Sequence, residues 1–152
     1  MSGTLNVGVI GCGNISSAYF RLSKLFQPIE VKACADLNVE IAQAQAEQFG
    51  LEALSVEDLI SHSELDIVVN LTVPNAHFAV SKAILEAGKH VYSEKPLTLS
   101  LEDGLALRDL AEQKGLRVAC TPDTLLGGTH QQARAMIDAG TLGEIVGGTC
   151  HV

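Results

Sequence analysis

Short apolar segments alternate with segments of helical periodicity along most of this chain. Several apolar segments are rich in Val and Ile and lack polar alternation, which is typical of strands covered on both faces. We predict strands over residues 5–10, 30–35, 66–71, 90–93 and 117–120. The intervening segments begin at capping residues or end at glycines, and they predict helices over 15–25, 39–49, 74–87, 100–115 and 129–139, with a short helix that starts at Ser55.

The order of these elements predicts the fold class. Strands that alternate with helices pair in parallel through right-handed crossovers, which gives an α/β fold with a doubly wound, Rossmann-like sheet. Residues 1–140 are predicted to form this one domain. Residues 141–152 turn from the last helix to a predicted strand that has little to pair with. We therefore expect this stretch to start the passage into a C-terminal domain that the chain lacks.

A glycine turn follows the first predicted strand, with the sequence Gly11-Cys12-Gly13-Asn14-Ile15-Ser16. Gly11 permits the tight turn, Gly13 lets the backbone approach a pyrophosphate, and the following helix offers free N–H groups. The third position of this fingerprint is Ser16, which departs from the usual Gly or Ala but is small enough for helix–strand packing. Cys12 is expected to be a small loop side chain without a catalytic role, because a bound phosphate would cover it.

Asp36 directly follows the second predicted strand. An acidic residue at this distance from the glycine turn accepts hydrogen bonds from the adenosine ribose hydroxyls and repels a 2′-phosphate. Leu37 and Asn38 come next, so no Arg follows to accommodate that phosphate. The pattern favours NAD over NADP as the cofactor. The alternative is an aspartate that caps a helix beside a structural turn.

Lys95 lies just after the strand predicted over 90–93, and Pro96 stiffens the turn that carries it. Ligands of open parallel sheets bind beyond the carboxyl ends of the strands. A lysine held there beside a nicotinamide can relay the proton of a substrate hydroxyl during hydride transfer. The alternative is a solvated surface lysine, which is the usual fate of this residue, and the residues alone leave both readings open.

The segment after the strand predicted over 66–71 reaches the same edge of the sheet. The backbone of Thr72 and the side-chain amide of Asn75 can serve a ribose, and His77 lies one turn into the next helix. His77 is either a possible substrate-side residue or a packing or capping residue. Asp123 follows the strand predicted over 117–120 and is either a further substrate-side residue or a turn aspartate after a proline.

Composition and charge narrow the function classes. The chain holds 18 acidic against 10 basic residues, a net charge of −8, which argues against a nucleic-acid partner. No apolar run is long enough to span a bilayer, and the first residues do not resemble a signal peptide, so no membrane partner is expected. The four cysteines form no metal-ligand spacing, so we predict no metal site and a reducing, cytoplasmic location.

Taken together, these residues resemble the N-terminal domain of the glucose–fructose oxidoreductase and inositol dehydrogenase (Gfo/Idh/MocA) family over essentially the whole chain. The resemblance rests on the glycine turn, Asp36, Thr72-Val73-Pro74-Asn75 with His77, Glu94-Lys95-Pro96-Leu97 and the tail over 137–145. Glycine turns occur in many folds, whereas Glu-Lys-Pro downstream of Pro-Asn-x-His is far more specific.

The resemblance implies an NAD(P)-dependent oxidation of a secondary alcohol on a sugar, inositol or related polyol, or the reverse reaction. Residue by residue, it implies that the pyrophosphate is held by Gly11, Gly13, Asn14 and Ile15, and the adenosine ribose by Asp36. It further implies that Thr72, Pro74, Asn75 and Glu94 line the nicotinamide side and that Lys95 is the catalytic-site lysine.

The family also has a second α/β domain with a large open sheet, which supplies an Asp and a His to the active site and usually the interface of a homo-oligomer. We find no counterpart of it in this chain and expect the chain alone to be inactive. Two hypotheses follow: the chain is the cofactor half of an oxidoreductase, or it is a dinucleotide-binding regulatory or scaffold module without catalysis.

Overall fold

The computed structural model describes residues 3–149 and 151. They belong to two compact units, one that ends at Thr121 and one that begins at Pro122, and each unit is described by itself. Within these residues, no helix combines the length and the apolar character that crossing a membrane requires.

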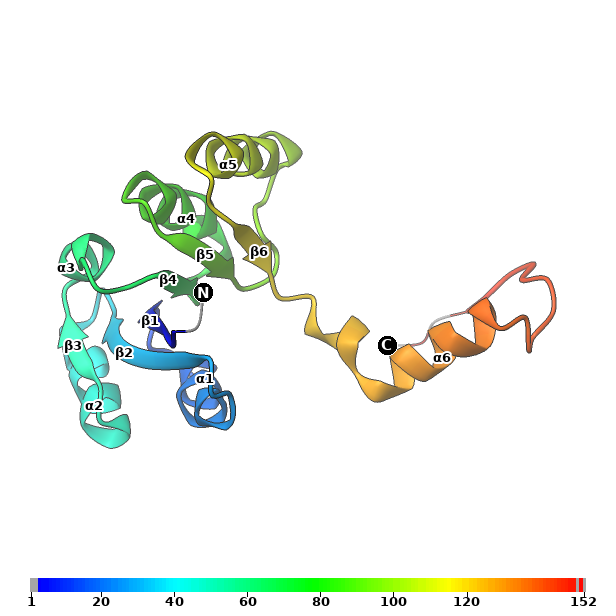
Figure 1. The fold of residues 1–152 in the computed structure, drawn as a ribbon, viewed down its shortest axis with the longest axis horizontal. Coiled ribbons are helices and arrows are strands. Elements are labelled where there is room, and N and C mark those ends of the chain that lie inside the picture. Colours follow the sequence, from blue (N-terminus) through cyan, green and yellow to red (C-terminus); the bar gives the residue numbers. More distant parts are fainter. Residues whose placement is uncertain (1–2, 150, 152) are drawn as a thin grey trace. The chain divides into compact units, whose positions relative to one another are not determined.

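The first unit is built on a six-stranded parallel sheet (Figure 1). Its strands are β1 (Leu5–Ile10), β2 (Ile29–Ala35), β3 (Glu52–Leu54), β4 (Ile67–Asn70), β5 (His90–Ser93) and β6 (Val118–Cys120). In the strand order β3-β2-β1-β4-β5-β6, the chain adds β2 and β3 on one side of β1 and then β4, β5 and β6 on the other. This is the order of a doubly wound dinucleotide-binding sheet, so the predicted fold class is confirmed.

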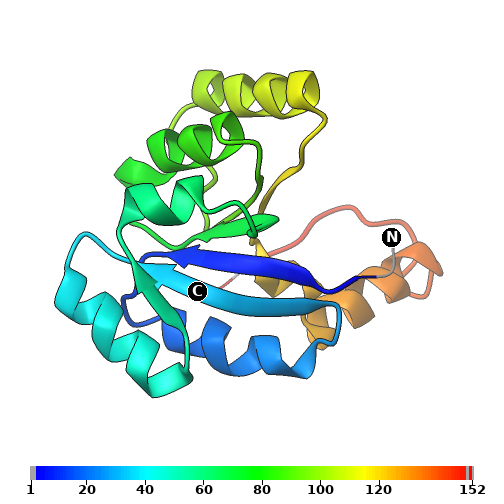
Figure 2. The same ribbon diagram turned by 60° about the vertical axis from the view of Figure 1, so that its left-hand side comes forward.

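Helices cover both faces of the sheet (Figures 1 and 2). The helices α1 (Ser16–Leu22) and α2 (Val39–Phe49) bury Phe20, Ala42 and Ala46 against one face. The helices α3 (Val56–Ser61), α4 (His77–Glu86) and α5 (Leu101–Lys114) cover the other face, where Leu59, Ile84, Leu85, Leu107 and Ala111 meet the apolar side chains of the central strands. The central strands are therefore buried on both faces, which explains their continuous apolar sequences.

Side-chain caps fix where several helices begin. The Asn38 side chain accepts a hydrogen bond from the backbone N–H of Glu40 at the start of α2. The hydroxyls of Ser55 and Ser100 accept from the third residue after each of them, at the starts of α3 and α5. Such caps satisfy N–H groups that have no partner within the helix, and the sequence predicted the starts of all three helices.

Several elements differ from the prediction by one residue at an end, and three differ by more. The helix predicted over 15–25 divides into α1 and a 3-10 turn, η1 (Ser23–Leu25), and the one over 74–87 divides into a 3-10 turn, η2 (Pro74–Ala76), and α4. Strand β3 was not predicted, because three residues carry too little pattern to be recognised. It forms through pairing with residues 33–35 of β2.

The second unit holds a 3-10 turn, η3 (Asp123–Leu126), and helix α6 (Gly128–Asp138). The strand predicted within 141–152 is wrong for residues 141–149, which form no strand. Gly143 has φ = 71°, a left-handed conformation that turns the backbone away from an extended path, and a strand also needs the backbone of a neighbouring strand to pair with. Residues 150 and 152 lie outside the described residues.

Candidate functional site

The carboxyl ends of β1, β4 and β5 meet at one edge of the sheet. Ile10 is aligned with Asn70, and Asn70 with Ser93, so the three loops that follow these strands start side by side. These loops carry the glycine turn, the segment 71–76 and the segment 94–98. The edge lies where β1 and β4 are neighbours. At this point the chain changes the side of the sheet to which it adds strands, and doubly wound folds bind their ligands there.

Gly11 is required by its surroundings. Its φ of 100° is one that side chains rarely adopt, and a Cβ there would lie 2.6 Å from the carbonyl oxygen of Leu71. Gly13 differs, because a Cβ there would meet nothing within 4 Å. Folding therefore does not require a glycine at position 13, and the exposed space above it is open to a ligand.

The turn between Gly11 and α1 presents unused hydrogen-bond donors. In the described part of the chain, the backbone N–H groups of Gly13, Asn14 and Ile15 have no acceptor, and no side chain caps the start of α1. The Ser16 hydroxyl donates instead to the carbonyl oxygen of Gly13 across 2.7 Å, which fixes the shape of the turn. Adjacent free N–H groups of this kind suit the oxygens of a phosphate.

Asp36 is built into the same turn. Its Oδ2 accepts a hydrogen bond from the backbone N–H of Cys12 across 2.7 Å, and its Oδ1 accepts from that of Asn38 across 2.9 Å. The carboxylate is only half-buried, so acceptor capacity remains for a hydroxyl that approaches from solvent. The structure therefore brings Asp36 and the glycine turn together, and the helix-capping alternative does not apply, since Asn38 caps α2.

The thiol of Cys12 is shielded by the protein itself. The side chain is buried, and its Sγ donates to the carbonyl oxygen of Ala35. The neighbouring Cys34 side chain, and then burial, raise the pKa of Cys12 far above the usual range for a thiol. Cys12 therefore stays protonated, in agreement with the non-catalytic role predicted for it.

The loop after β4 is held by a buried polar side chain. Asn70 accepts from both the backbone N–H and the hydroxyl of Thr72, at 3.2 and 2.7 Å. The amide nitrogen of Asn70 donates to the carbonyl oxygen of His77 and to the hydroxyl of Ser81. Thr72 is thereby fixed, while Pro74 and Asn75 are exposed in η2 at the same edge.

His77 lies in the interior, where its side chain is 1% exposed. Its Nε2 is 2.9 Å from the carbonyl oxygen of Thr72, and its Nδ1 is 2.6 Å from that of Pro96. Both ring nitrogens are occupied by the backbone and none faces the open edge. This placement favours the packing alternative over the predicted substrate contact.

Glu94 and Lys95 follow β5. The Glu94 Oε1 accepts from the hydroxyl of Tyr19 in α1 across 2.9 Å, and its Oε2 accepts from the backbone N–H of Lys95 across 3.0 Å. The Lys95 side chain is exposed at the edge, and the Lys95–Pro96 peptide bond is cis. The hydrogen bond to Glu94 anchors the backbone of Lys95, while the exposed amine is open to a ligand.

Two residues that contribute to this edge, Tyr19 and Asn70, were not identified from the sequence. Tyr19 contacts Glu94 over 75 positions of the chain, and no local pattern marks such a partner. Asn70 carries a better signal, since a polar amide that ends an otherwise apolar strand needs buried partners. Asp123 belongs to the second unit, and its side chain lies outside the described ones, so its role stays a prediction.

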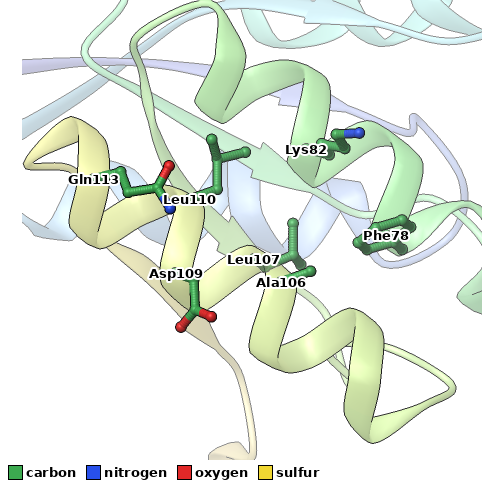
Figure 3. Close-up of a pocket in the computed structure, with 7 residues that line it drawn as sticks. All are labelled: Phe78, Lys82, Ala106, Leu107, Asp109, Leu110 and Gln113. Carbon is green, nitrogen blue, oxygen red and sulfur yellow. The ribbon is translucent and has the colours of Figure 1, made fainter.

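A hollow of about 330 Å³ lies between α4 and α5, away from these loops (Figure 3). It is lined by Phe78, Lys82, Ala106, Leu107, Asp109, Leu110 and Gln113. None of the residues predicted to bind a cofactor or substrate lines it.

Comparisons with known proteins agree with this geometry. A family model described as "Oxidoreductase family, NAD-binding Rossmann fold" matches residues 5–121. An inositol 2-dehydrogenase from Salmonella typhimurium is 30% identical over 93% of this chain and 44% of its own length. The solved structure of KijD10, a 3-ketoreductase from Actinomadura kijaniata in complex with NADP and TDP-benzene, is 30% identical with a TM-score of 0.88, over 94% of this chain and 45% of that one.

A second solved structure carries the other cofactor. The WlbA dehydrogenase from Bordetella pertussis, in complex with NADH and UDP-GlcNAcA, is 26% identical with a TM-score of 0.88, over 95% of this chain and 42% of that one. The chain thus spans less than half the length of these proteins.

Proposed function

This chain belongs to the oxidoreductase family with an NAD-binding Rossmann fold, and from that premise we propose that it binds NAD(H) as the cofactor part of a sugar or polyol oxidoreductase. The substrate class rests on the relative that is an inositol 2-dehydrogenase and on the neighbour solved with UDP-GlcNAcA. The reaction proposed is hydride transfer between the cofactor and a secondary alcohol or the corresponding ketone.

One observation carries the cofactor proposal: the hydrogen bond from the Cys12 N–H to the Asp36 carboxylate. It fixes an acceptor for ribose hydroxyls at the end of the glycine turn, whose free N–H groups at 13–15 suit a pyrophosphate. The open space above Gly13 fits the close approach that a dinucleotide needs. The residues present therefore fit the cofactor that the family implies.

Asp36 also supports NAD over NADP. Its carboxylate is already bound to two backbone N–H groups, so it cannot swing away from a 2′-phosphate without losing both hydrogen bonds. Two negative groups held at hydrogen-bonding distance repel each other. Neighbours of this chain use either cofactor, since one is solved with NADP and another with NADH, and the preference is therefore a property of this turn.

The chemistry of the proposed reaction divides between cofactor and protein. The nicotinamide, when bound, accepts or returns the hydride. Lys95 would hold or relay the hydroxyl proton through its exposed amine, while Glu94 orients the Lys95 backbone and Thr72, Pro74 and Asn75 line the nicotinamide side. Residues 141–152 would lead toward a second domain that completes the substrate site and forms the contacts of a homo-oligomer.

A cofactor titration of the 152-residue chain tests the proposal. We expect NADH to bind, with quenching or a blue shift of its nicotinamide fluorescence, and to bind at least tenfold more tightly than NADPH, since about 1.4 kcal/mol of charge repulsion corresponds to that factor. Equal or tighter binding of NADPH contradicts the NAD preference. Absence of binding by either cofactor contradicts the proposed function itself.

Catalysis is tested separately from binding. A longer protein that contains this chain and binds NADH, yet turns over no polyol or sugar, would favour the regulatory or scaffold alternative. Turnover that depends on Lys95 would favour the oxidoreductase.

A further inference from the structure

The ring of His77 connects two loops that the strands alone leave separate. One loop follows β4 and includes the carbonyl of Thr72, and the other follows β5 and includes the carbonyl of Pro96. The ring nitrogens lie 2.9 and 2.6 Å from these two oxygens, and the residue is 1% exposed. Among the described side chains of this edge, His77 alone contacts the backbone of both loops.

These contacts need an imidazole. Carbonyl oxygens only accept hydrogen bonds, so either contact is a hydrogen bond only where the facing ring nitrogen carries a hydrogen. The neutral ring carries one N–H, and its tautomer sets which of the two carbonyls receives it. An apolar side chain of similar size would leave both carbonyls next to a group that cannot donate, and unpaired buried polar groups are costly. A packing role alone would need only the shape of the ring, whereas the observed contacts use both of its nitrogens.

His77 is itself held in place by the chain. Its backbone carbonyl accepts from the amide of Asn70 across 3.1 Å, and the same Asn70 fixes Thr72. The ring therefore projects toward Pro96 from a residue whose own backbone carbonyl is held by Asn70. The loop that carries Lys95 thereby has two anchors, the His77 ring on Pro96 and the Glu94 carboxylate on the Lys95 N–H.

We propose that His77 is a positioning residue that locks the loops after β4 and β5 together and so sets the nicotinamide side of the cofactor site and the backbone of Lys95. This inference rests on the proposed function for the identity of the ligand. It assigns His77 no contact with substrate or cofactor. The residue acts through the two carbonyls that it holds.

The test compares two ligands on the 152-residue chain. NADH reaches both halves of the proposed site, whereas ADP lacks the nicotinamide and reaches only the glycine turn and Asp36. His77→Leu is expected to weaken NADH binding by about tenfold while the affinity for ADP stays unchanged, because loops released from the ring hold the binding arrangement only part of the time and the apparent affinity falls by that fraction. His77→Gln retains an N–H donor and is expected to recover part of the loss.

His90→Leu is the matched control. His90 also binds the backbone through its ring, since its Nδ1 accepts from the N–H of Arg117 across 3.0 Å, but it begins β5 at the opposite end of the strand. It is expected to leave the ratio of NADH to ADP affinity unchanged. Thermal melts confirm that each variant is folded, and His77→Gln keeps the test possible if His77→Leu does not fold.

Hydrogen exchange without any ligand provides the second readout. His77→Leu should accelerate exchange in both segments 71–76 and 94–98, and His90→Leu should not. If wild-type chain binds neither ligand, the proposed function fails and exchange alone decides the role of His77. An unchanged affinity ratio with wild-type binding, or unchanged exchange in the two loops, overturns the inference while the proposed function stands.

Discussion

The hydroxyl of Tyr19 donates a hydrogen bond to Glu94 Oε1 across 2.9 Å and so joins helix α1 to the loop after β5. The glycine turn precedes α1, and Lys95 follows Glu94, so this bond links the two ends of the proposed cofactor site. Burial, and then the hydrogen bond to Glu94 and its negative charge, raise the pKa of Tyr19 well above its ordinary value. The protonated phenol is the form that donates this hydrogen bond.

A pH series on Tyr19→Phe tests this link. A raised pKa in the folded state means stability that is fully present below the unfolded pKa of about 10 and is lost as pH rises through the folded pKa. The difference in unfolding free energy between wild type and Tyr19→Phe should therefore fall above pH ~10, by up to about 1.4 kcal/mol per pH unit. Urea denaturation at several pH values measures it.

Glu94→Gln supplies the control for that series. Without the negative charge the pKa of Tyr19 is raised less. The Tyr19→Phe difference should therefore begin to fall at the same pH, which the unfolded pKa sets, but level off sooner. A difference that stays constant across the alkaline range would mean that the Tyr19–Glu94 bond makes no contribution to stability in solution.

Gly11 and Gly13 should respond oppositely to alanine. Gly11→Ala places a Cβ against the Leu71 carbonyl at a positive φ, so we expect a loss of roughly 1–3 kcal/mol in unfolding free energy. Gly13→Ala meets no protein atom within 4 Å and should leave stability nearly unchanged, while NADH affinity falls at least tenfold. Denaturation and NADH titration of both variants measure the contrast. Tight NADH binding by Gly13→Ala would place the pyrophosphate elsewhere.

Asp36→Ala should alter both cofactor choice and the turn. Loss of the carboxylate removes the repulsion of a 2′-phosphate, so the ratio of NADH to NADPH affinity should move toward one. It also leaves the N–H groups of Cys12 and Asn38 without their acceptor, and we expect about 1–3 kcal/mol of lost stability. Asp36→Asn, which keeps an acceptor but removes the charge, should relax cofactor choice with a smaller loss. An unchanged ratio in both variants would contradict the role of Asp36.

The secondary-structure elements that were predicted best are those that a local sequence pattern determines. The bounds of β1, β5 and α2 match their predicted ranges. The ends of α2 are marked by the Asn38 cap and Gly50, and the end of β1 is marked by Gly11. Strand β3 was not predicted, because its three residues form a strand only through their pairing with β2. The strand expected in 141–152 had no partner strand to pair with, and the left-handed Gly143 turns the chain there instead.

The same distinction holds at the candidate site. Gly11 and Asp36 were recognised because a fingerprint fixes their spacing, and the structure brings them together through the Cys12 N–H. Tyr19 and the bridging role of His77 depend on contacts between elements that are far apart in sequence. The sequence shows that a polar side chain is present at a position. It does not show which backbone groups that side chain will contact, because these contacts form only when the helices pack on the sheet.

Lys95→Met separates binding from proton transfer. Within the described part of the chain, the exposed Lys95 amine makes no hydrogen bond or ion pair that would shape the loop, so NADH affinity should remain nearly unchanged. The isolated chain should turn over inositol or glucose negligibly. In a longer active protein that contains the chain, loss of one proton-transfer group should lower kcat by ~10²–10⁴-fold. Lys32→Met, in the middle of β2, is the control. Wild-type turnover by Lys95→Met would make Lys95 a surface residue.

The last prediction concerns the second unit, in which several apolar side chains are at least half exposed. They include Leu125, Leu126, Leu142 and Ile145. Exposed apolar groups gathered in a short segment promote association, so we expect the 152-residue chain to self-associate through this unit rather than through the glycine turn. Ile145→Glu should shift light scattering toward monomer, whereas Leu101→Glu, equally apolar and exposed at the start of α5, should not. A monomer at high concentration that is indifferent to Ile145→Glu would show that this surface needs no partner. Saturating NADH should leave the association of the wild-type chain unchanged, because the proposed cofactor site belongs to the first unit.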